Sequence, residues 1–567
     1  MELSGEDPFR WLVRFRAPLR KKPPAGLRWP TDGWADMNFD MKTCLLSVLS
    51  LACLTTLPAR AETYDVVIRH GRVVDGTGNP AFFADVAVEN GRIAAIGWIA
   101  GKGRKEIGAT GLIVAPGFID VHTHADSVAN MPLAENFVRM GVTTVVAGNC
   151  GGSALDVGKA LQAIEKKKVS VNYATLIGHN TVRSKAMGGT FNRPPTAPEM
   201  QKMKALVEQA MKDGAVGLST GLIYLPGVFA TTDEIVELAK VASAYDGIYT
   251  SHMRTEGTGI LGALDELFRI AREGNMRAEI SHMKLSGERA WGQADQVLAT
   301  IERARAEGLD ITHDQYAYTA SSTGIRQTIS EDAFEGGRNK FLERLKDPAQ
   351  KAKIMTDMKQ KLHDRGRDDY AYAVIASYKH DPSLNGLNIV EAAKKTRGAD
   401  SLDDQIETIL ETEKNGGASG IFHGMNEQDV QKFMRHPNTM VACDGGLLKF
   451  GENVPHPRGY GNNARVLGRY VRELKVLRLE DAIRKMTNLP AKTFHFKDRG
   501  ELREGNWADI VLFDPEKVQD IGTFKDPHHY PTGISQVLVN GKVVLANGER
   551  TDARPGHTLR HRSTTAN

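Results

Sequence analysis

Two histidines one residue apart end the stretch APGFIDVHTH, which spans residues 115–124. In a β-strand, residues i and i+2 point to the same face, so His122 and His124 would present their imidazoles on one side. Paired imidazoles in a fixed orientation are suited to binding a metal ion. Because this spacing alone is common in proteins, it indicates a metal site only if further ligands come together nearby.

A second pair of histidines occurs in SHMRTEG (251–257) and SHMKLSG (281–287). His252 and His282 are thirty residues apart, the length of one strand–helix–strand unit, so the repeated letters need no internal duplication. A single histidine at a strand end is more often a hydrogen-bonded structural residue than a ligand. Two at the ends of neighbouring strands would lie close together, so we expect this pair to share one site.

Cys150 in AGNCGGS and Asp444 in ACDGG follow two further apolar runs. A free cysteine is most often a small buried residue, and Asp-Gly is a common turn pair. Beside a metal, however, a thiolate is a strong ligand, and a carboxylate can move a proton between water and a leaving group. Cys443 is expected to point away from Asp444, into the core.

Short β-branched runs alternate with amphipathic segments from about residue 110 to 320. A capping box, Thr231 to Glu234, marks the start of one predicted helix. Alternating strands and helices predict an α/β fold with a parallel sheet, and we expect a closed (β/α)₈ barrel within residues 112–497. Its strands are predicted at 112–121, 142–148, 171–178, 215–221, 247–253, 277–283, 309–316 and 438–445. Active sites of such barrels form at the carboxyl ends of the strands, where all the residues singled out above stand.

The flanks of the barrel region have a different pattern. Residues 62–111 and 498–555 contain alternating strands with Asn-Gly and Asp-Gly turns, which predict one small β-sandwich built from both chain ends. Residues 325–435 are charged and helical, and we expect them to be an insertion between strands seven and eight that covers the barrel mouth.

The N-terminal part has the features of an export signal. Met41-Lys42 opens an apolar run that ends at Ala59-Arg60-Ala61, in the order of a secretory signal, so residues 41–61 are predicted to be removed before Glu62. We expect a periplasmic protein whose translation starts at Met41 or Met37, with residues 1–40 as a non-native or disordered leader. The alternative is an apolar segment within a folded domain. The run is short for a membrane span, so no stable membrane insertion is expected.

Composition excludes several other classes of protein. The 567 residues are 41% hydrophobic and 25% charged, as in ordinary globular proteins, and a net charge of +4 is too small to indicate a nucleic-acid partner. If the signal is removed, Cys150 and Cys443 are the cysteines that remain, so the fold does not depend on a disulfide framework. The oligomeric state cannot be predicted from these features.

With GLSTGLIYLPG (217–227) and HPRGYG (456–461), these motifs resemble the amidohydrolase superfamily. More narrowly, the chain resembles the N-acyl-D-amino-acid deacylases, or D-aminoacylases, from about residue 63 to 550. Many binuclear relatives carry a carboxylated lysine in the fourth strand, whereas AVGLSTG at 215–221 has none, which favours the narrower resemblance.

The resemblance implies a zinc enzyme with one tight metal site and a second, weaker one. Cys150, His252 and His282 would be the ligands of a tightly held Zn²⁺. His122 and His124 would provide the second position, with Cys150 able to bridge the two.

The resemblance also implies roles in catalysis and substrate binding. Asp444 would be the general acid and base. Lys284 and Arg458 match positions that hold the α-carboxylate of the substrate, and an arginine can bind a carboxylate with two hydrogen bonds. Tyr316 and Ser321 fall on a motif that contacts the substrate.

Some stretches depart from the family pattern. They are GNNARVL after HPRGY, CDGG at strand eight, and THDQYAY at strand seven. His313 is an additional imidazole that we expect near the barrel mouth. These differences leave the predicted metal ligands intact and concern the choice of substrate side chain.

The implied reaction is zinc-dependent hydrolysis of the amide bond of a small-molecule N-acyl-D-amino acid, giving a carboxylate and a free D-amino acid. Two alternatives stay open. One is another amidohydrolase activity, on cyclic amides as in hydantoinases and dihydroorotases, or on dipeptides. The other is a catalytically inactive binding protein on the same scaffold.

Overall fold

The computed structural model describes residues 63–561. Within this range, strands from both ends of the chain form one nine-stranded sheet in the order β23-β22-β21-β20-β5-β1-β2-β3, with β4 paired to β1. This is the small β-sandwich that the flanking sequences predict, and it buries apolar side chains from both chain ends. The strands are β1 (Thr63–Val73), β2 (Phe82–Glu89), β3 (Arg92–Gly97), β4 (Lys102–Gly108), β5 (Ile113–Pro116), β20 (Ile510–Phe513), β21 (Ile534–Val539), β22 (Lys542–Ala546) and β23 (Glu549–Arg550).

Eight successive parallel strand positions make up the barrel in the described part of the chain. They are β6 (Phe118–Asp120), β8 (Val142–Ala147), β9 (Asn172–Thr175) continued by β10 (Ile177–Gly178), β11 (Gly217–Gly221), β12 (Ile248–His252), β13 (Ala278–Ile280), β14 (Ile311–Gln315) and β18 (Thr439–Val441). Strand one meets strand eight where β7 (Thr123–His124) pairs in parallel with β19 (Gly445–Gly446). At that seam the Asp444 N–H donates to the His122 carbonyl oxygen at 2.9 Å, so barrel closure itself brings these two residues together.

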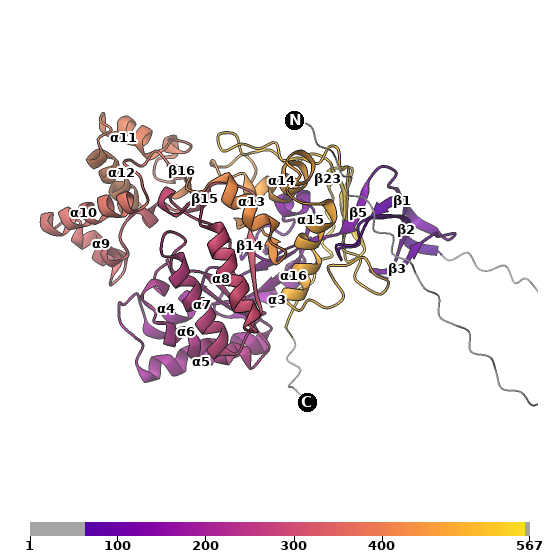
Figure 1. The fold of residues 1–567 in the computed structure, drawn as a ribbon, viewed down its shortest axis with the longest axis horizontal. Helices are drawn as coiled ribbons and strands as arrows, with labels where there is room; N and C mark the ends of the chain where they lie inside the picture. Colours follow the sequence, from indigo (N-terminus) through magenta and orange to yellow (C-terminus); the bar gives the residue numbers. More distant parts are fainter. Residues whose placement is uncertain (1–62, 562–567) are drawn as a thin grey trace, which may run out of the picture. The chain divides into compact units, whose positions relative to one another are not determined.

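Helices follow the strands and bury one face against the barrel (Figure 1). They include α2 (Glu135–Arg139), α3 (Val157–Lys167), α4 (His179–Met187), α5 (Ala197–Asp213), α6 (Thr232–Ser243), α7 (Ile260–Gly274), α8 (Ala294–Ala306), α13 (Glu427–Arg435), α14 (Arg458–Arg465), α15 (Leu479–Met486) and α16 (Asn488–Thr493). As predicted, α6 begins after Thr231, whose side chain accepts a hydrogen bond from the Glu234 N–H. The predicted capping box is only half formed, because the Glu234 carboxylate lies 2.8 Å from His179 Nε2 instead of capping Thr231.

The insertion between strands seven and eight forms its own layer with a separate hydrophobic core. Its helices α9–α12 lie together in Figure 1. The layer consists of β15 (Ser321–Gly324), α9 (Arg338–Arg344), α10 (Pro348–Asp364), β16 (Ala373–Ser377), α11 (Ile389–Arg397), α12 (Leu402–Lys414) and β17 (Ser419–Phe422). The three strands pair antiparallel in the order β15-β17-β16.

The first predicted strand, 112–121, is wrong as a single element. It divides at Gly117 into β5, which joins the sandwich sheet, and β6, which joins the barrel. The Gly117 N–H donates to the Asp509 carbonyl oxygen, and a Cβ at this position would lie 2.2 Å from the Thr143 side chain. One continuous apolar run therefore serves two sheets, which hydrophobic periodicity cannot reveal.

Other predicted boundaries also shift. The inserted layer starts at Ser321 rather than 325, and α13 packs against α8 and β18 as a helix of the barrel, although it falls inside the predicted 325–435 segment. After the sandwich, Gly556 and Thr558 bridge to the start of β9, so the chain continues along the barrel past residue 555. The predicted leader (1–40) and signal segment (41–61) lie outside the described residues, and within those residues no helix is long and apolar enough to cross a membrane.

Candidate active site

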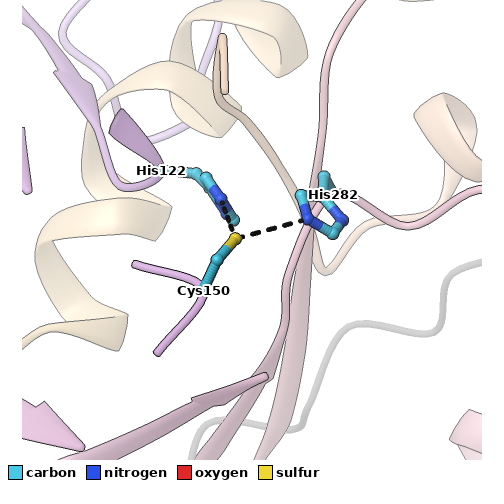
Figure 2. Close-up of side chains that lie close together, drawn as sticks. All are labelled: His122, Cys150 and His282. Atoms are coloured by element: carbon cyan, nitrogen blue, oxygen red, sulfur yellow. Dashed lines mark hydrogen bonds between the residues drawn. The ribbon is translucent and has the colours of Figure 1, made fainter. Parts of the chain in front are cut away.

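Three imidazoles from the ends of three barrel strands surround the sulfur of Cys150, which follows a fourth strand. Its Sγ lies 3.3 Å from His122 Nε2, 3.7 Å from His252 Nδ1 and 3.7 Å from His282 Nε2. Figure 2 shows the thiol between the rings of His122 and His282. Strand ends that are far apart in sequence thus place one sulfur and three imidazole nitrogens in contact range.

A second cluster shares His122. His124 Nε2 lies 3.1 Å and His122 Nε2 lies 3.6 Å from Asp444 Oδ1. The ligand atoms of His122, His124 and Asp444 lie within 4.8 Å of one another, as do those of His122, Cys150 and His282. These two groups share His122, while His252, predicted with Cys150 and His282, is grouped instead with His282 and Glu256.

Three of these residues have left-handed backbone conformations. The φ angles are 53° at Cys150, 38° at His282 and 49° at Asp444. Non-glycine residues rarely adopt such angles, and when they do they cluster at functional sites. At each of these strand ends the backbone departs from the extended conformation and directs the side chain into the site.

Strand four supports the cysteine loop. The Ser219 hydroxyl donates to the Gly148 carbonyl oxygen and accepts from the Gly151 N–H. Gly221 packs so closely that a Cβ there would lie 2.2 Å from the Cys150 carbonyl oxygen. This strand presents no lysine to the site, and position 221 has no room for a side chain.

Asp314 is a buried site residue that the sequence reasoning did not identify. Its Oδ2 lies 3.2 Å from His122 Nδ1, the nitrogen that faces away from Cys150. His313, expected near the mouth, instead points out of the barrel: its Nε2 lies 2.7 Å from the Thr439 hydroxyl and its ring lies beside His436. Strand alternation explains both findings, because Asp314 shares a face with the predicted site residue Tyr316 and His313 does not.

Electrostatics favour an ionised thiol and an ionised carboxylate. Burial disfavours the Cys150 thiolate, but the neighbouring imidazoles, chiefly His122, lower its pKa well below the usual value. Burial likewise opposes charge on Asp444, yet the Arg458 guanidinium and His122 hold the pKa of this carboxyl well below its usual range. The site thus holds its anionic donors deprotonated, the form that a metal ion requires.

Among the predicted substrate-binding side chains, Arg458 contacts Asp444 directly. Arg458 Nη2 lies 2.9 Å from Asp444 Oδ2, and its guanidinium stacks 4.5 Å from the Tyr316 ring centroid. Lys284 Nζ lies 5.7 Å from the same centroid. The Tyr316 hydroxyl is turned to the Met425 sulfur at 3.7 Å.

Two cavities meet at Asp444 and Ser322. One is a groove of about 430 Å³ that also contacts Arg458, a size typical of small-molecule sites. The other, of about 60 Å³, is lined by Lys284 and Ser321 together with His252, His282 and residues of the inserted layer. The insertion therefore supplies one wall of the candidate site.

The donor set fits zinc. A sulfur, imidazole nitrogens and a carboxylate are the ligands that Zn²⁺ takes in proteins, and in the described residues they form three groups whose ligand atoms lie within 4.8 Å of one another. The buried His252 Nε2 and Arg458 Nη1 have no hydrogen-bond partner among the described residues. His252 Nε2 faces Glu256 Oε1 at 3.8 Å, beyond hydrogen-bond distance. Buried polar atoms in proteins are normally paired, so the unpaired Arg458 Nη1 indicates a group that faces a ligand.

Arg254, in the first Ser-His-Met stretch, does not enter the site. It pairs with Glu266 at 2.8 Å and donates to the carbonyl oxygens of Val228 and Ala230. Its role is to hold the loop after β12 against α7. Glu256 lies in the same stretch, and its carboxylate is close to His252, His282 and Lys284. The sequence reasoning did not identify this residue either.

The chain is similar to known proteins along most of its length. The Amidohydrolase family model matches residues 105–545. A D-aminoacylase of Alcaligenes xylosoxydans xylosoxydans is 35% identical over 525 residues, covering 88% of this chain and 98% of the relative. The structure of an N-acyl-D-glutamate deacylase from Bordetella bronchiseptica, complexed with zinc and a phosphonate inhibitor, is 35% identical with a TM-score of 0.75. A D-aminoacylase structure described for its binuclear metal centre is 34% identical, also with a TM-score of 0.75.

Both structural matches cover 88% of this chain and all of the other chain. The family model and these full-length similarities together show that the protein belongs to the amidohydrolase family, within its D-aminoacylase group.

Proposed function

We propose that this protein hydrolyses the amide bond of N-acyl-D-amino acids and releases a carboxylate and a free D-amino acid. The observation that carries the proposal is the Asp444–Arg458 ion pair of 2.9 Å beside the cysteine–histidine cluster. The proton acceptor Asp444 lines both cavities, the carboxylate-binding Arg458 lines the larger one, and two imidazoles of the metal-binding group line the smaller one. The relatives described as D-aminoacylase and N-acyl-D-glutamate deacylase support the choice of substrate.

Zinc would be held tightly by Cys150, His252 and His282, with a weaker position at His122 and His124. When bound, it supplies the Lewis acidity that polarises an amide carbonyl and makes water a nucleophile near neutral pH.

Asp444 moves the proton. Its lowered pKa keeps it ionised and able to accept a proton from the attacking water. Its Oδ1 also lies beside His124 and His122, so the oxygen that accepts the proton faces the predicted second metal position. Asp444 then returns the proton to the amine nitrogen as the C–N bond breaks.

Arg458 and Lys284 bind the α-carboxylate of the substrate. Arg458 uses one side of its guanidinium for Asp444, and its buried Nη1 has no partner within the described residues, so it is available to a substrate oxygen. Fixing the α-carboxylate and the scissile carbonyl leaves one direction for the side chain. This three-point arrangement gives selection between D- and L-amino acids a physical basis.

The two alternatives have less support. Hydantoinase-type relatives usually depend on a lysine in strand four, and here Gly221 lies too close to Cys150 for any side chain. An inactive scaffold would be expected to lose ligands, whereas all the predicted metal-binding residues and Asp444 come together.

Replacing the proton carrier tests the mechanism. The Asp444→Asn protein should keep its tight zinc and lose at least about a hundredfold in kcat, the usual contribution of a general acid and base. A zinc-loaded Asp444→Asn protein that hydrolyses N-acyl-D-amino acids at the parent rate would overturn the assignment.

A further inference from the structure

Glu256 lies in the middle of the loop between β12 and α7 and points its carboxylate into the site. Its Oε1 is 2.5 Å from Lys284 Nζ, 3.0 Å from His282 Nδ1 and 3.8 Å from His252 Nε2. The side chain is 12% exposed, and that of Lys284 is 2% exposed. One carboxylate oxygen therefore contacts two predicted zinc ligands and a predicted substrate anchor.

The two imidazoles stand between Cys150 and Glu256. His282 presents Nε2 to the sulfur and Nδ1 to Glu256, while His252 presents Nδ1 to the sulfur and Nε2 to Glu256. Each ring thus has one nitrogen on the side of the thiol and the other on the side of the carboxylate.

For His282 to hold a metal through Nε2, its hydrogen must stay on Nδ1. A neutral imidazole that offers Nε2 as an electron pair carries its hydrogen on Nδ1, and that N–H needs an acceptor. Lys284 also lies near Nδ1, at 2.7 Å, but an ammonium is only a donor. Within the described residues, the acceptor that contacts Nδ1 is Glu256 Oε1.

Lys284 occupies the space on the carboxylate side. The ligand atoms of His252, Glu256 and His282 lie within 4.8 Å of one another, close enough to hold a cation. The Lys284 ammonium contacts two of them, and its charge partner there is Glu256. A metal ion is thereby directed to the side of the rings that faces Cys150.

We propose that Glu256 is a positioning residue that, through Oε1, fixes His282 with Nε2 toward the metal and holds the Lys284 ammonium for the substrate carboxylate. The proposal rests on the zinc and substrate assignments of the proposed function. Outer carboxylates that orient ligating histidines typically contribute about 10- to 100-fold to metal affinity.

The test compares three full-length variants in zinc affinity, measured by competition with a chelator, and in kinetics on N-acetyl-D-amino acids. Glu256→Gln keeps the shape and removes the charge. Glu256→Asp keeps the charge and shortens the side chain. Glu266→Gln is the matched control, because Glu266 pairs with Arg254 in the same region without contacting the site.

We expect Glu256→Gln to weaken zinc binding by about 10-fold or more. At saturating zinc it should raise KM more than it lowers kcat, because Lys284 loses its charge partner. Glu256→Asp should restore part of both losses, and Glu266→Gln should match the parent. If Glu256 only filled space, the shorter Asp would be the more damaging change, and that order of the variants would overturn the proposal.

Equal zinc affinity of Glu256→Gln and the parent would also overturn it. Failure of the proposed function is distinguishable, since a parent protein that binds zinc but hydrolyses no N-acyl-D-amino acid contradicts that function alone. The zinc affinities of the variants would still test the role of Glu256.

Discussion

Arg458 Nη2 lies 2.9 Å from Asp444 Oδ2, so the predicted proton carrier and the predicted anchor of the substrate carboxylate form one buried ion pair. The arginine lowers the pKa of Asp444 and at the same time offers a second nitrogen without a partner among the described residues. Binding of the substrate carboxylate and ionisation of Asp444 therefore depend on the same guanidinium.

Replacing Arg458 should affect both functions. In Arg458→Met the buried Asp444 loses its main positive neighbour, so its pKa rises, and the acid limb of kcat/KM should move to higher pH. KM should rise by at least about tenfold, since a charged hydrogen bond contributes roughly 1.5–3 kcal/mol. Arg458→Lys keeps the positive charge, so its pH profile should stay close to that of the parent. Its KM should still rise, because lysine lacks the second nitrogen that would bind the carboxylate. A pH profile unchanged in Arg458→Met would contradict the coupling.

Asp314 should affect metal binding through His122. Asp314→Asn removes the charge 3.2 Å from His122 Nδ1, and we expect about 10- to 100-fold weaker occupancy of the second metal position. Thr312→Val is the control, because Thr312 shares the strand face and its buried hydroxyl has no partner within the described residues. Metal titration followed by elemental analysis would measure the metal content of both variants. Equal occupancy of the second position in the two would refute this role of Asp314.

Gly221 should be required for the position of Cys150. In Gly221→Ala the new Cβ would lie 2.2 Å from the Cys150 carbonyl oxygen, so the loop must shift, and both the melting temperature and zinc affinity should fall. Gly262→Ala, in α7 with nothing within 4 Å, should instead stabilise the protein by about 0.5–1 kcal/mol. Thermal unfolding of the two variants should therefore shift in opposite directions. A shift in the same direction would argue against this packing.

The lowered pKa of Lys485 should make the stability of the fold depend on pH. Burial lowers its pKa to about 7, and its ammonium donates to the carbonyl oxygens of His436 and Thr439, just before and at the start of β18. Between about pH 7 and 10.5 the unfolded chain binds more protons than the folded one, so this group makes stability rise with pH in that window. Lys485→Met should remove that rise. Melting temperatures of both proteins from neutral to alkaline pH provide the measurement, and a constant difference between them would contradict the prediction.

The sequence identified the site residues at strand ends better than it identified the carboxylates that contact them, Glu256 and Asp314. His122, Cys150, His252, His282 and Asp444 each end an apolar run, and barrel topology brings such ends together. Glu256 has no such marker, because a glutamate in a loop is usually exposed. Its position depends on a chain path that sequence does not specify.

Asp314 could have been predicted from the sequence, since residues 312, 314 and 316 share one strand face.

The division of the first predicted strand at Gly117 could not have been predicted from the sequence. Both halves are apolar, and β5 lies between β1 and β20, the second of which is nearly four hundred residues away in the chain. Long-range pairing of this kind leaves no local pattern.

We propose that the protein is exported, on the basis of the signal-like segment at 41–61. Expression in a bacterial host with an intact export system should yield a mature protein that begins at Glu62 and is recovered from the periplasm. N-terminal sequencing checks this directly. A mature protein that still begins at Met1 would contradict export.

The most direct test of the central claim is the rate of hydrolysis of a panel of matched N-acetyl-D- and N-acetyl-L-amino acids by the purified zinc-loaded protein, with Asp444→Asn as the control. We predict release of acetate and free D-amino acid from at least one D-substrate, little or no reaction of its L-enantiomer, and loss of activity in the control. Zinc-loaded protein that leaves every D-substrate intact, or that prefers the L-enantiomers, would contradict the account.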